Sequence, residues 1–241
     1  MKRYHTRLAS ILLICLMGSR TWAAEPSDRQ AAKPARPILE PIEWTDIWVT
    51  DANKDDLPRV LFVGDSIVRG YFGRTEKELT GVAHCARYAT SAFLAQQDYL
   101  DSLKILLRRY HFAVIHINNG LHGWGYTEEQ YRQGFPPLIR LLEQYAPDAT
   151  IIWATTTPVR QRGHVEKLKV ESTERVRARN RIAAAFVKRH TFLTSDLFSL
   201  VIDHPEYYRE DGVHFNARGV AAQAEYVAGL VRQALKSRQH R

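Results

Sequence analysis

The fold is decided by the stretch RVLFVGDSIVRG, residues 59–70. Its first part, 59–63, is a short and mostly apolar run, which is typical of a strand buried within a sheet. Gly64 ends this run, and a helical pattern follows at 68–79. A buried strand that turns directly into a helix is the repeating unit of α/β proteins, so this stretch predicts a parallel sheet.

The chain downstream repeats this alternation. Further strands are predicted at 82–88, 112–117, 150–154 and 191–193. Further helices are predicted at 95–109, 127–145, 171–190 and from 216 to about 235, with Thr127 and Asn216 as N-terminal caps. This order predicts a five-stranded parallel sheet covered by helices on both faces. In such a sheet, functional groups gather at the carboxyl ends of the strands.

The first 42 residues follow a different pattern. Residues 1–24 combine a basic start, an apolar run at 8–18 and small residues at Ala23 and Ala24, the order of a secretory signal peptide. The apolar run is too short for a stable membrane anchor. We therefore predict a secreted or periplasmic protein, without stable membrane insertion once the signal is cleaved. Residues 25–42 are proline-rich and predict a linker, which leaves 43–241 as the folded domain. Within that domain, 43–49 is expected to dock as an N-terminal strap.

Charge and cysteine content narrow the function further. The formal net charge of +8 falls to +4 without residues 1–24, which hold Lys2, Arg3, Arg7 and Arg20 and no acid. The remaining basic residues cluster at 160–189 among glutamates, which predicts a solvated helix face. No recognition motif accompanies this charge, so we expect no nucleic-acid partner. Beyond residue 24 the chain holds one cysteine, Cys85, which we expect to be a buried structural thiol.

The first chemically informative segment is Gly64-Asp65-Ser66, directly after the first predicted strand. A serine in a tight turn between strand and helix has an exposed hydroxyl. Its backbone N–H lies near a helix N-terminus, where a developing oxyanion is stabilised. The segment is also compatible with a simple capped helix start.

The second segment is Asp211-Gly212-Val213-His214, just before the last predicted helix. A serine hydroxyl needs a base to act as a nucleophile, and histidine titrates close to neutral pH. A carboxylate three residues earlier can reach Nδ1 of the imidazole and fix its tautomer. Asp-Gly is also a common turn pair.

The third segment, residues 117–123, ends the strand predicted at 112–117 and carries Asn118, Asn119 and His122 together with glycines at 120 and 123. A side-chain amide at this edge of the sheet can donate a hydrogen bond to an oxyanion. Taken singly, the segment is also typical of a polar turn.

Taken together, the segments resemble those of the SGNH, or GDSL-type, hydrolase family. Gly64-Asp65-Ser66 is similar to the nucleophile block of that family, and Asp211-Gly212-Val213-His214 to its C-terminal block. The resemblance implies a three-layer, flavodoxin-like α/β/α fold for the domain at 43–241. It also implies an acyl-enzyme mechanism without a metal or cofactor, with Ser66 as nucleophile, His214 as general base and acid, and Asp211 as its orienting carboxylate.

The remaining family blocks match less closely, so they do not decide which residues form the oxyanion hole. The second block has no glycine here, and the backbone N–H of Thr90 or Ser91 is its substitute. In the third block, either Asn119 is the donor or His122 takes the place of the family's asparagine. The N–H of Ser66 is expected to complete the set.

The predicted function is therefore that of a secreted serine esterase acting on a small acyl ester. An O-acetyl group on a carbohydrate is the favoured substrate, with Trp124 and Tyr126 as candidate substrate-binding side chains. One alternative is a non-catalytic carbohydrate-binding protein on the same fold. Another is a metal-dependent phosphoesterase, with Asp65, Asn119, Asp211 and His214 as possible ligands. The other histidines show no paired ligand spacing, so no metal site is predicted.

Overall fold

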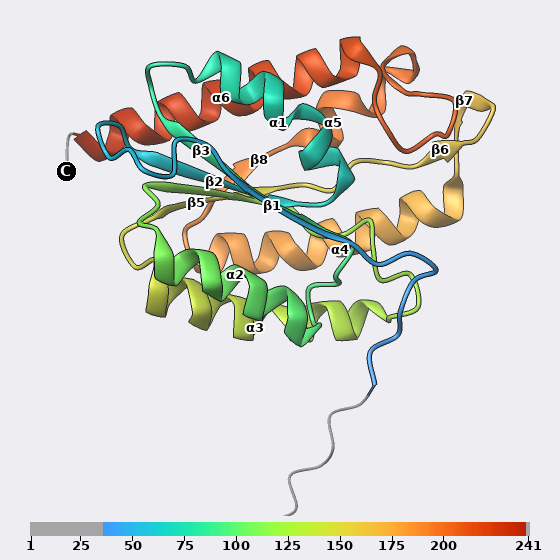
Figure 1. Cartoon of the computed structure of the whole chain (residues 1–241). Helices are drawn as coiled ribbons and strands as arrows, with labels where there is room; N and C mark the ends of the chain where they lie inside the picture. Colours follow the sequence, from blue (N-terminus) through green and yellow to red (C-terminus); the bar gives the residue numbers. More distant parts are fainter. Residues whose placement is uncertain (1–35, 240–241) are drawn as a thin grey trace, which may run out of the picture. The chain divides into compact units, whose positions relative to one another are not determined.

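A six-stranded sheet forms the centre of residues 36–239, the part of the chain that this computed structural model describes (Figure 1). In order across the sheet, the strands are β1 (Thr45–Val49), β3 (His84–Thr90), β2 (Arg59–Gly64), β4 (Val114–Ile117), β5 (Thr150–Ala154) and β8 (Leu193–Ser195). From β3 to β8 all neighbours pair in parallel. These five strands follow the flavodoxin-like order, so the predicted parallel sheet is confirmed.

The segment that was expected to dock as a strap, 43–49, instead contributes a sixth strand, β1, to the sheet. This segment pairs with β3 in antiparallel fashion, from Thr45 opposite Thr90 to Val49 opposite Ala86. It therefore extends the sheet at one edge. An antiparallel edge strand on an otherwise parallel sheet is common, and here it lies beside the strand that carries the second predicted block.

Helices cover both faces of the sheet (Figure 1). On one face lie α1 (Ser66–Glu78), α5 (Leu197–Ile202) and α6 (Ala217–Gln239); on the other lie α2 (Gln97–Arg109), α3 (Glu128–Tyr145) and α4 (Val170–Arg189). Both predicted caps are confirmed. The hydroxyl of Thr127 accepts from the N–H of Gln130, and the Asn216 side chain accepts from the N–H groups of Arg218 and Gly219.

The central strand β2 shows how the sequence produces these layers. All of its residues are buried, and successive side chains point to opposite faces. Val60 and Phe62 join the core beneath α1 and α6, whereas Leu61 and Val63 join the core beneath α2 and α3. Each such side chain contributes roughly 1.5–3 kcal/mol by burial. This two-sided core fixes the end of β2, and with it the position of Ser66.

The segment between β5 and α6 holds structure that the pattern of apolar residues did not indicate. A hairpin of β6 (Arg160–Gln161) and β7 (His164–Leu168) precedes α4, and a short helix, η1 (Pro205–Tyr207), follows α5. The solvated basic face predicted for 160–189 is wrong at two positions. Arg160 and Arg179 are buried, and both donate hydrogen bonds to backbone carbonyls. The prediction that Cys85 is a buried thiol is confirmed, since Cys85 is free and buried in β3.

The N-terminal limit of the domain also needs correction. Residues from Pro37 onward belong to the compact unit, so the last part of the predicted linker is packed. The N–H of Ile38 donates to the hydroxyl of Tyr126, and Glu40 accepts from the N–H of Gly123. The predicted signal peptide and the rest of the linker lie outside the described residues. Within 36–239, no helix has the length and apolar character needed to cross a membrane.

Candidate active site

Ser66 lies where β2 turns into α1, at the carboxyl edge of the sheet. Asp65 caps the helix, because its Oδ1 accepts from the N–H of Ile67 at 2.9 Å. Ser66 is the first helical residue, so its N–H is one of the unpaired donors at the positive end of the helix. Gly64 permits this tight turn, since a Cβ there would overlap the side chain of Val68. Asp65 is fully enclosed, and burial raises the pKa of its carboxyl.

His214 and Asp211 lie in the loop before α6 and form one hydrogen-bonded unit. Asp211 Oδ2 lies 2.8 Å from His214 Nδ1, while Oδ1 accepts from the N–H groups of Val213 and His214, both at 2.8 Å. Burial opposes ionisation of Asp211. The two N–H donors and the imidazole outweigh it and hold the pKa of this carboxyl below its usual range.

The conformation of this loop depends on Gly212, which has a φ of 74°. Only glycine adopts this region without strain. A Cβ at this position would also overlap the carbonyl of Arg160, so the loop can approach the β6–β7 hairpin only with glycine there.

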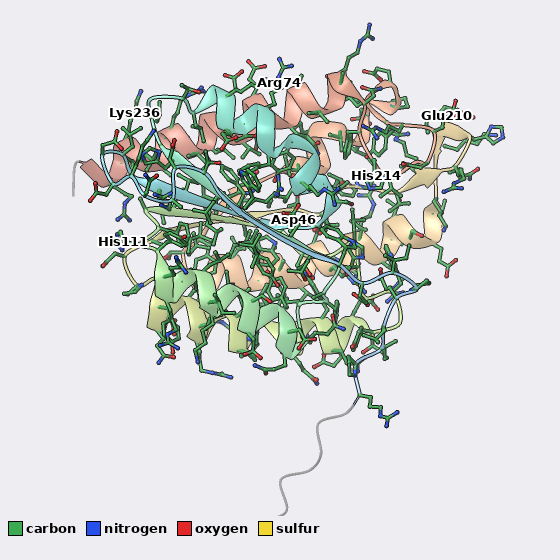
Figure 2. All side chains as sticks on the ribbon, viewed as in Figure 1. Asp46, Arg74, His111, Glu210, His214 and Lys236 are labelled. Atoms are coloured by element: carbon green, nitrogen blue, oxygen red, sulfur yellow. The ribbon has the colours of Figure 1, made fainter. Side chains whose placement is uncertain are left out.

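The fold brings the first two segments into contact. His214 Nε2 lies 2.9 Å from the hydroxyl of Ser66, although the two residues are 148 positions apart. The side chains of Asp211, His214 and Ser66 therefore form a continuous hydrogen-bonded chain. Figure 2 places His214 on the opposite side of the domain from His111, which immediately precedes the predicted third strand. The hydrogen-bonded side chains of Asp211, His214 and Ser66 thus lie at the carboxyl edge of the sheet, where the sequence predicted them.

An open pocket of about 710 Å³ lies over this chain. Ser66 and His214 line it together with His122, and Trp44, Arg69 and Arg209 are further lining residues. The guanidinium of Arg69 lies 5.5 Å from the centre of the Trp44 ring. The pocket therefore presents a serine hydroxyl to solvent between an aromatic ring and basic side chains.

Of the expected oxyanion donors other than Ser66, the structure brings His122 to the pocket and turns Asn119 and Ser91 away. The amide of Asn119 is used inside the molecule, where it accepts from the N–H of Leu94 and donates to the carbonyl of Ala92. Ser91 is tied to the segment before β1, since both its N–H and its hydroxyl bond to Trp44. The reason in both cases is that these polar groups satisfy buried backbone atoms of neighbouring loops.

His122 is held by a partner that the sequence did not reveal, Glu40. The Oε2 atom of Glu40 lies 2.7 Å from His122 Nδ1, and Oε1 accepts from the N–H of Gly123 at 2.8 Å. Glu40 is 82 positions away, in the segment predicted as a linker. Its position between two prolines, Pro37 and Pro41, was the reason for that prediction.

The expected substrate-binding residues Trp124 and Tyr126 are not among the residues that line the pocket over Ser66. Tyr126 stacks on Phe93 with ring centres 4.5 Å apart. Trp124 packs against the guanidinium groups of Arg175 and Arg179. Both rings pack against the core of the domain, and Arg175 of α4 holds this loop by donating to the backbone carbonyls of Trp124 and Tyr126. Trp44 and Phe215 are the aromatic residues that line the pocket. For Trp44, the only signal in the sequence was its place in the expected strap.

A metal site would need several ligating side chains in one place. Among the side chains described in 36–239, no group of three or more His, Cys, Asp and Glu lies close enough to hold a metal ion.

Comparisons with solved structures place this fold among known proteins. A structure described as a carbohydrate esterase family 3 from Talaromyces cellulolyticus has a TM-score of 0.60 and 12% identity, covering 75% of this chain and 99% of its own. The aryl esterase of M. smegmatis has a TM-score of 0.60 and 14% identity, covering 73% and 99%. A GDSL-like lipase from Bacteroides thetaiotaomicron has a TM-score of 0.54 and 14% identity, covering 74% and 88%.

At the level of sequence, no family model and no curated protein matches the chain. The structural likeness shows that the chain has the fold of these GDSL-like lipases and esterases, and the fold predicted from the resemblance is confirmed.

Proposed function

We propose that the protein is a serine esterase that hydrolyses a small acyl ester through an acyl-enzyme intermediate. The observation that carries the proposal is the hydrogen-bonded chain from Asp211 through His214 to Ser66, open to a pocket at the carboxyl edge of the sheet. Serine is a weak nucleophile unless a base removes its proton, and this chain supplies both the base and the carboxylate that orients it.

The reaction follows from this geometry. As Ser66 Oγ attacks the acyl carbon, its proton passes to His214 Nε2, and the Asp211 carboxylate stabilises the imidazolium that forms. The imidazolium then returns the proton to the leaving alcohol, which departs as the acyl-enzyme forms. Water attacks the acyl-enzyme by the same route in reverse, releasing the acid and restoring Ser66.

The negative charge that develops on the carbonyl oxygen needs donors on the other side of Ser66. The N–H of Ser66 at the N-terminus of α1 supplies one. His122 supplies the second, in the place of the family's asparagine, because it shares the pocket with Ser66 while Asn119 is engaged elsewhere.

For the substrate we propose an O-acetyl ester of an extracellular carbohydrate. Trp44 supports this proposal, since an aromatic ring at the pocket wall provides a surface for a sugar ring. The fold likeness to a protein described as a carbohydrate esterase points the same way. Export to a secreted or periplasmic location, based on the signal-like residues 1–24, agrees with a carbohydrate substrate outside the cell.

Hydrolysis of p-nitrophenyl acetate by the chain from residue 25 onward, beside its Ser66→Ala variant, tests the function. We expect turnover that resists a chelator and falls by on the order of 10⁶-fold in the variant, because the nucleophile is lost. Equal activity in the two proteins would exclude Ser66 as the nucleophile. Chelator-sensitive cleavage of a phosphoester would favour the metal-dependent alternative. A protein that binds acetylated sugars without turnover would favour the binding alternative.

A further inference from the structure

A second carboxylate–histidine pair, Glu40–His122, borders the pocket in addition to Asp211–His214. In both pairs a carboxylate oxygen lies within 2.8 Å of Nδ1, which leaves Nε2 as the free end of the ring. For His214 this free end contacts the hydroxyl of Ser66. For His122, Nε2 forms no hydrogen bond to any residue that the structure describes.

The hydrogen bond at Nδ1 limits what His122 can do. A neutral imidazole carries a single N–H, and a carboxylate at Nδ1 keeps that proton on Nδ1. A neutral His122 would then present a bare Nε2, which accepts hydrogen bonds and would repel an oxyanion. Only the imidazolium form, with both nitrogens protonated, can bond to Glu40 and donate from Nε2 at the same time.

The charges around His122 favour this form. Burial disfavours the charged ring, but the hydrogen bond to Glu40 and the negative charges of Asp65, Glu40 and Glu43 outweigh burial and raise the pKa of His122. Arg69 and Arg209 line the same pocket and act in the opposite direction, as does Arg179 behind the loop. The pKa of Glu40 is lowered in turn: burial opposes its ionisation, and the bonds to His122 and Gly123 prevail.

The backbone that carries His122 is fixed from the opposite side. The buried guanidinium of Arg179 donates to the carbonyls of Gly120, His122 and Gly123, at 2.9, 2.6 and 2.9 Å. Glu40 is fixed as well, since its own N–H donates to the Glu43 carboxylate. The backbone segments around His122 and Glu40 are therefore both held in place. The contact of His122 Nδ1 with the Glu40 carboxylate then orients the ring and favours its protonated form.

We infer that Glu40 is a positioning residue that holds His122 as an imidazolium, so that His122 donates from Nε2 to the oxyanion formed at Ser66. The inference rests on the proposed esterase function and adds a residue from the segment before β1 to the machinery. It also requires the two histidines to work in opposite protonation states. His214 must be neutral to accept the proton of Ser66, and His122 must be charged to donate.

The first test measures protonation and does not depend on activity. The titration of the His122 ring is followed by NMR in the wild type and in Glu40→Gln, with His122→Asn used to assign the signal. The glutamine keeps an oxygen that can accept from the N–H of Gly123, so the loop contact is retained. We expect the midpoint of His122 to move to lower pH in Glu40→Gln. An unchanged midpoint would overturn the inference, even if the protein proves to have no esterase activity.

The second test uses the pH profile of kcat/KM for p-nitrophenyl acetate. We expect kcat/KM of the wild type to fall at high pH as His122 loses its proton. In Glu40→Gln, this alkaline limb of the profile should lie at lower pH. In His122→Asn, whose amide donates without titrating, the limb disappears and adding Glu40→Gln no longer affects the profile. A structural role alone would make Glu40→Gln equally harmful in both backgrounds and would contradict the inference.

The size of the effect and a control complete this test. At neutral pH we expect Glu40→Gln to cost less than the roughly 10²-fold loss typical of removing one oxyanion donor. Glu129→Gln removes a carboxylate of the same charge from the exposed surface of α3, where it pairs only with Arg132 and Gln133 among the described side chains. This control is expected to leave the profile unchanged.

Discussion

The two carboxylate–histidine pairs at the pocket are alike in geometry and different in origin. Asp211 and His214 are three residues apart in one loop, whereas Glu40 and His122 come from segments 82 residues apart. The His122 side chain is 20% exposed and that of His214 is 42% exposed, so the first pair is the more enclosed. The two rings share the bond at Nδ1 and differ at Nε2. His214 Nε2 contacts the hydroxyl of Ser66, and His122 Nε2 forms no hydrogen bond to a described residue. We propose that the first accepts the proton of Ser66 and the second donates to an oxyanion. The group that Nε2 faces, rather than the pair itself, therefore decides the role of each histidine.

The largest expected difference between the pairs is in the cost of losing the ring. His214→Ala removes the proposed general base, and we expect kcat/KM for p-nitrophenyl acetate to fall by on the order of 10⁶-fold. His122→Ala removes one proposed oxyanion donor, and we expect a fall of roughly 10²-fold. Steady-state kinetics of the two variants check this order. Equal losses, or a larger loss in His122→Ala, would mean that the roles are assigned to the wrong pairs.

Removing the charge of the orienting carboxylate should likewise cost more activity at Asp211 than at Glu40. Asp211→Asn leaves the shape of the loop but permits the wrong tautomer of His214, so we expect a loss of roughly 10³- to 10⁴-fold in kcat. That loss should exceed the effect of Glu40→Gln under the same conditions. If the aspartate variant keeps most of its turnover, the His214 ring is oriented by another group.

The Asp211–His214 loop also depends on Gly212, and this dependence is a matter of stability. Gly212→Ala combines a strained φ with an overlap against the Arg160 carbonyl, and we expect it to lower the free energy of unfolding by about 1–3 kcal/mol. Gly163→Ala is the matched control, because Gly163 has the same φ of 74° and no neighbouring atom that a Cβ would meet. Denaturant titration should show the greater loss in the Gly212 variant. Equal losses would show that the overlap with Arg160 is relieved at little cost.

The smallest expected effect is the pH dependence of stability contributed by Glu40 and His122. The pKa of Glu40 is lowered by folding, so its contribution is present above its unfolded pKa and is lost as the pH falls through the folded pKa. The pKa of His122 is raised, so its contribution is present below its unfolded pKa and is lost as the pH rises through the folded pKa. The difference in Tm between the wild type and Glu40→Gln should therefore be greatest between these limits. A difference that does not vary with pH would show that the pair is not ionised in the folded protein.

The sequence was sufficient for the parts of the site that are marked by local motifs. The apolar run before Gly64 and the Asp-Gly turn at Asp211 are local features of the sequence, and the first lies at the carboxyl end of a parallel strand. Ser66, His214 and Asp211 could therefore be named, and the structure brings them together. Four of the five parallel strands, β2, β3, β4 and β5, were predicted for the same reason, since each is marked by its own largely buried run. The fifth, β8, is short and mostly exposed, and it lies at Leu193–Ser195 where 191–193 was predicted.

Features set by contacts between distant segments could not be predicted. Asn119 and His122 are three residues apart, and which of them faces the pocket depends on how the loop meets Ala92 and Arg179. Glu40 was hidden among prolines, in a segment whose composition suggested a linker. Its contact with His122 across 82 residues leaves no spacing that sequence alone can show.

The position of Trp44 has the same cause. Its backbone is held by Ser91, and its ring reaches the pocket because β1 pairs at the edge of the sheet beside β3. Trp124 and Tyr126, which lie shortly after His122 in sequence, pack within the domain. Closeness in sequence to His122 was thus a poor guide to the aromatic rings of the pocket, whereas Phe215, next to His214, does line it.

The most direct test of the central claim, that Ser66 is an activated nucleophile, is covalent labelling with a fluorophosphonate followed by peptide mass spectrometry. We expect a single adduct on the peptide that contains Ser66, formed by the wild type and not by Ser66→Ala or, at a comparable rate, by His214→Ala. No adduct on the folded wild-type protein, or an adduct on a different residue, would contradict the assignment of Ser66, His214 and Asp211 as a catalytic unit.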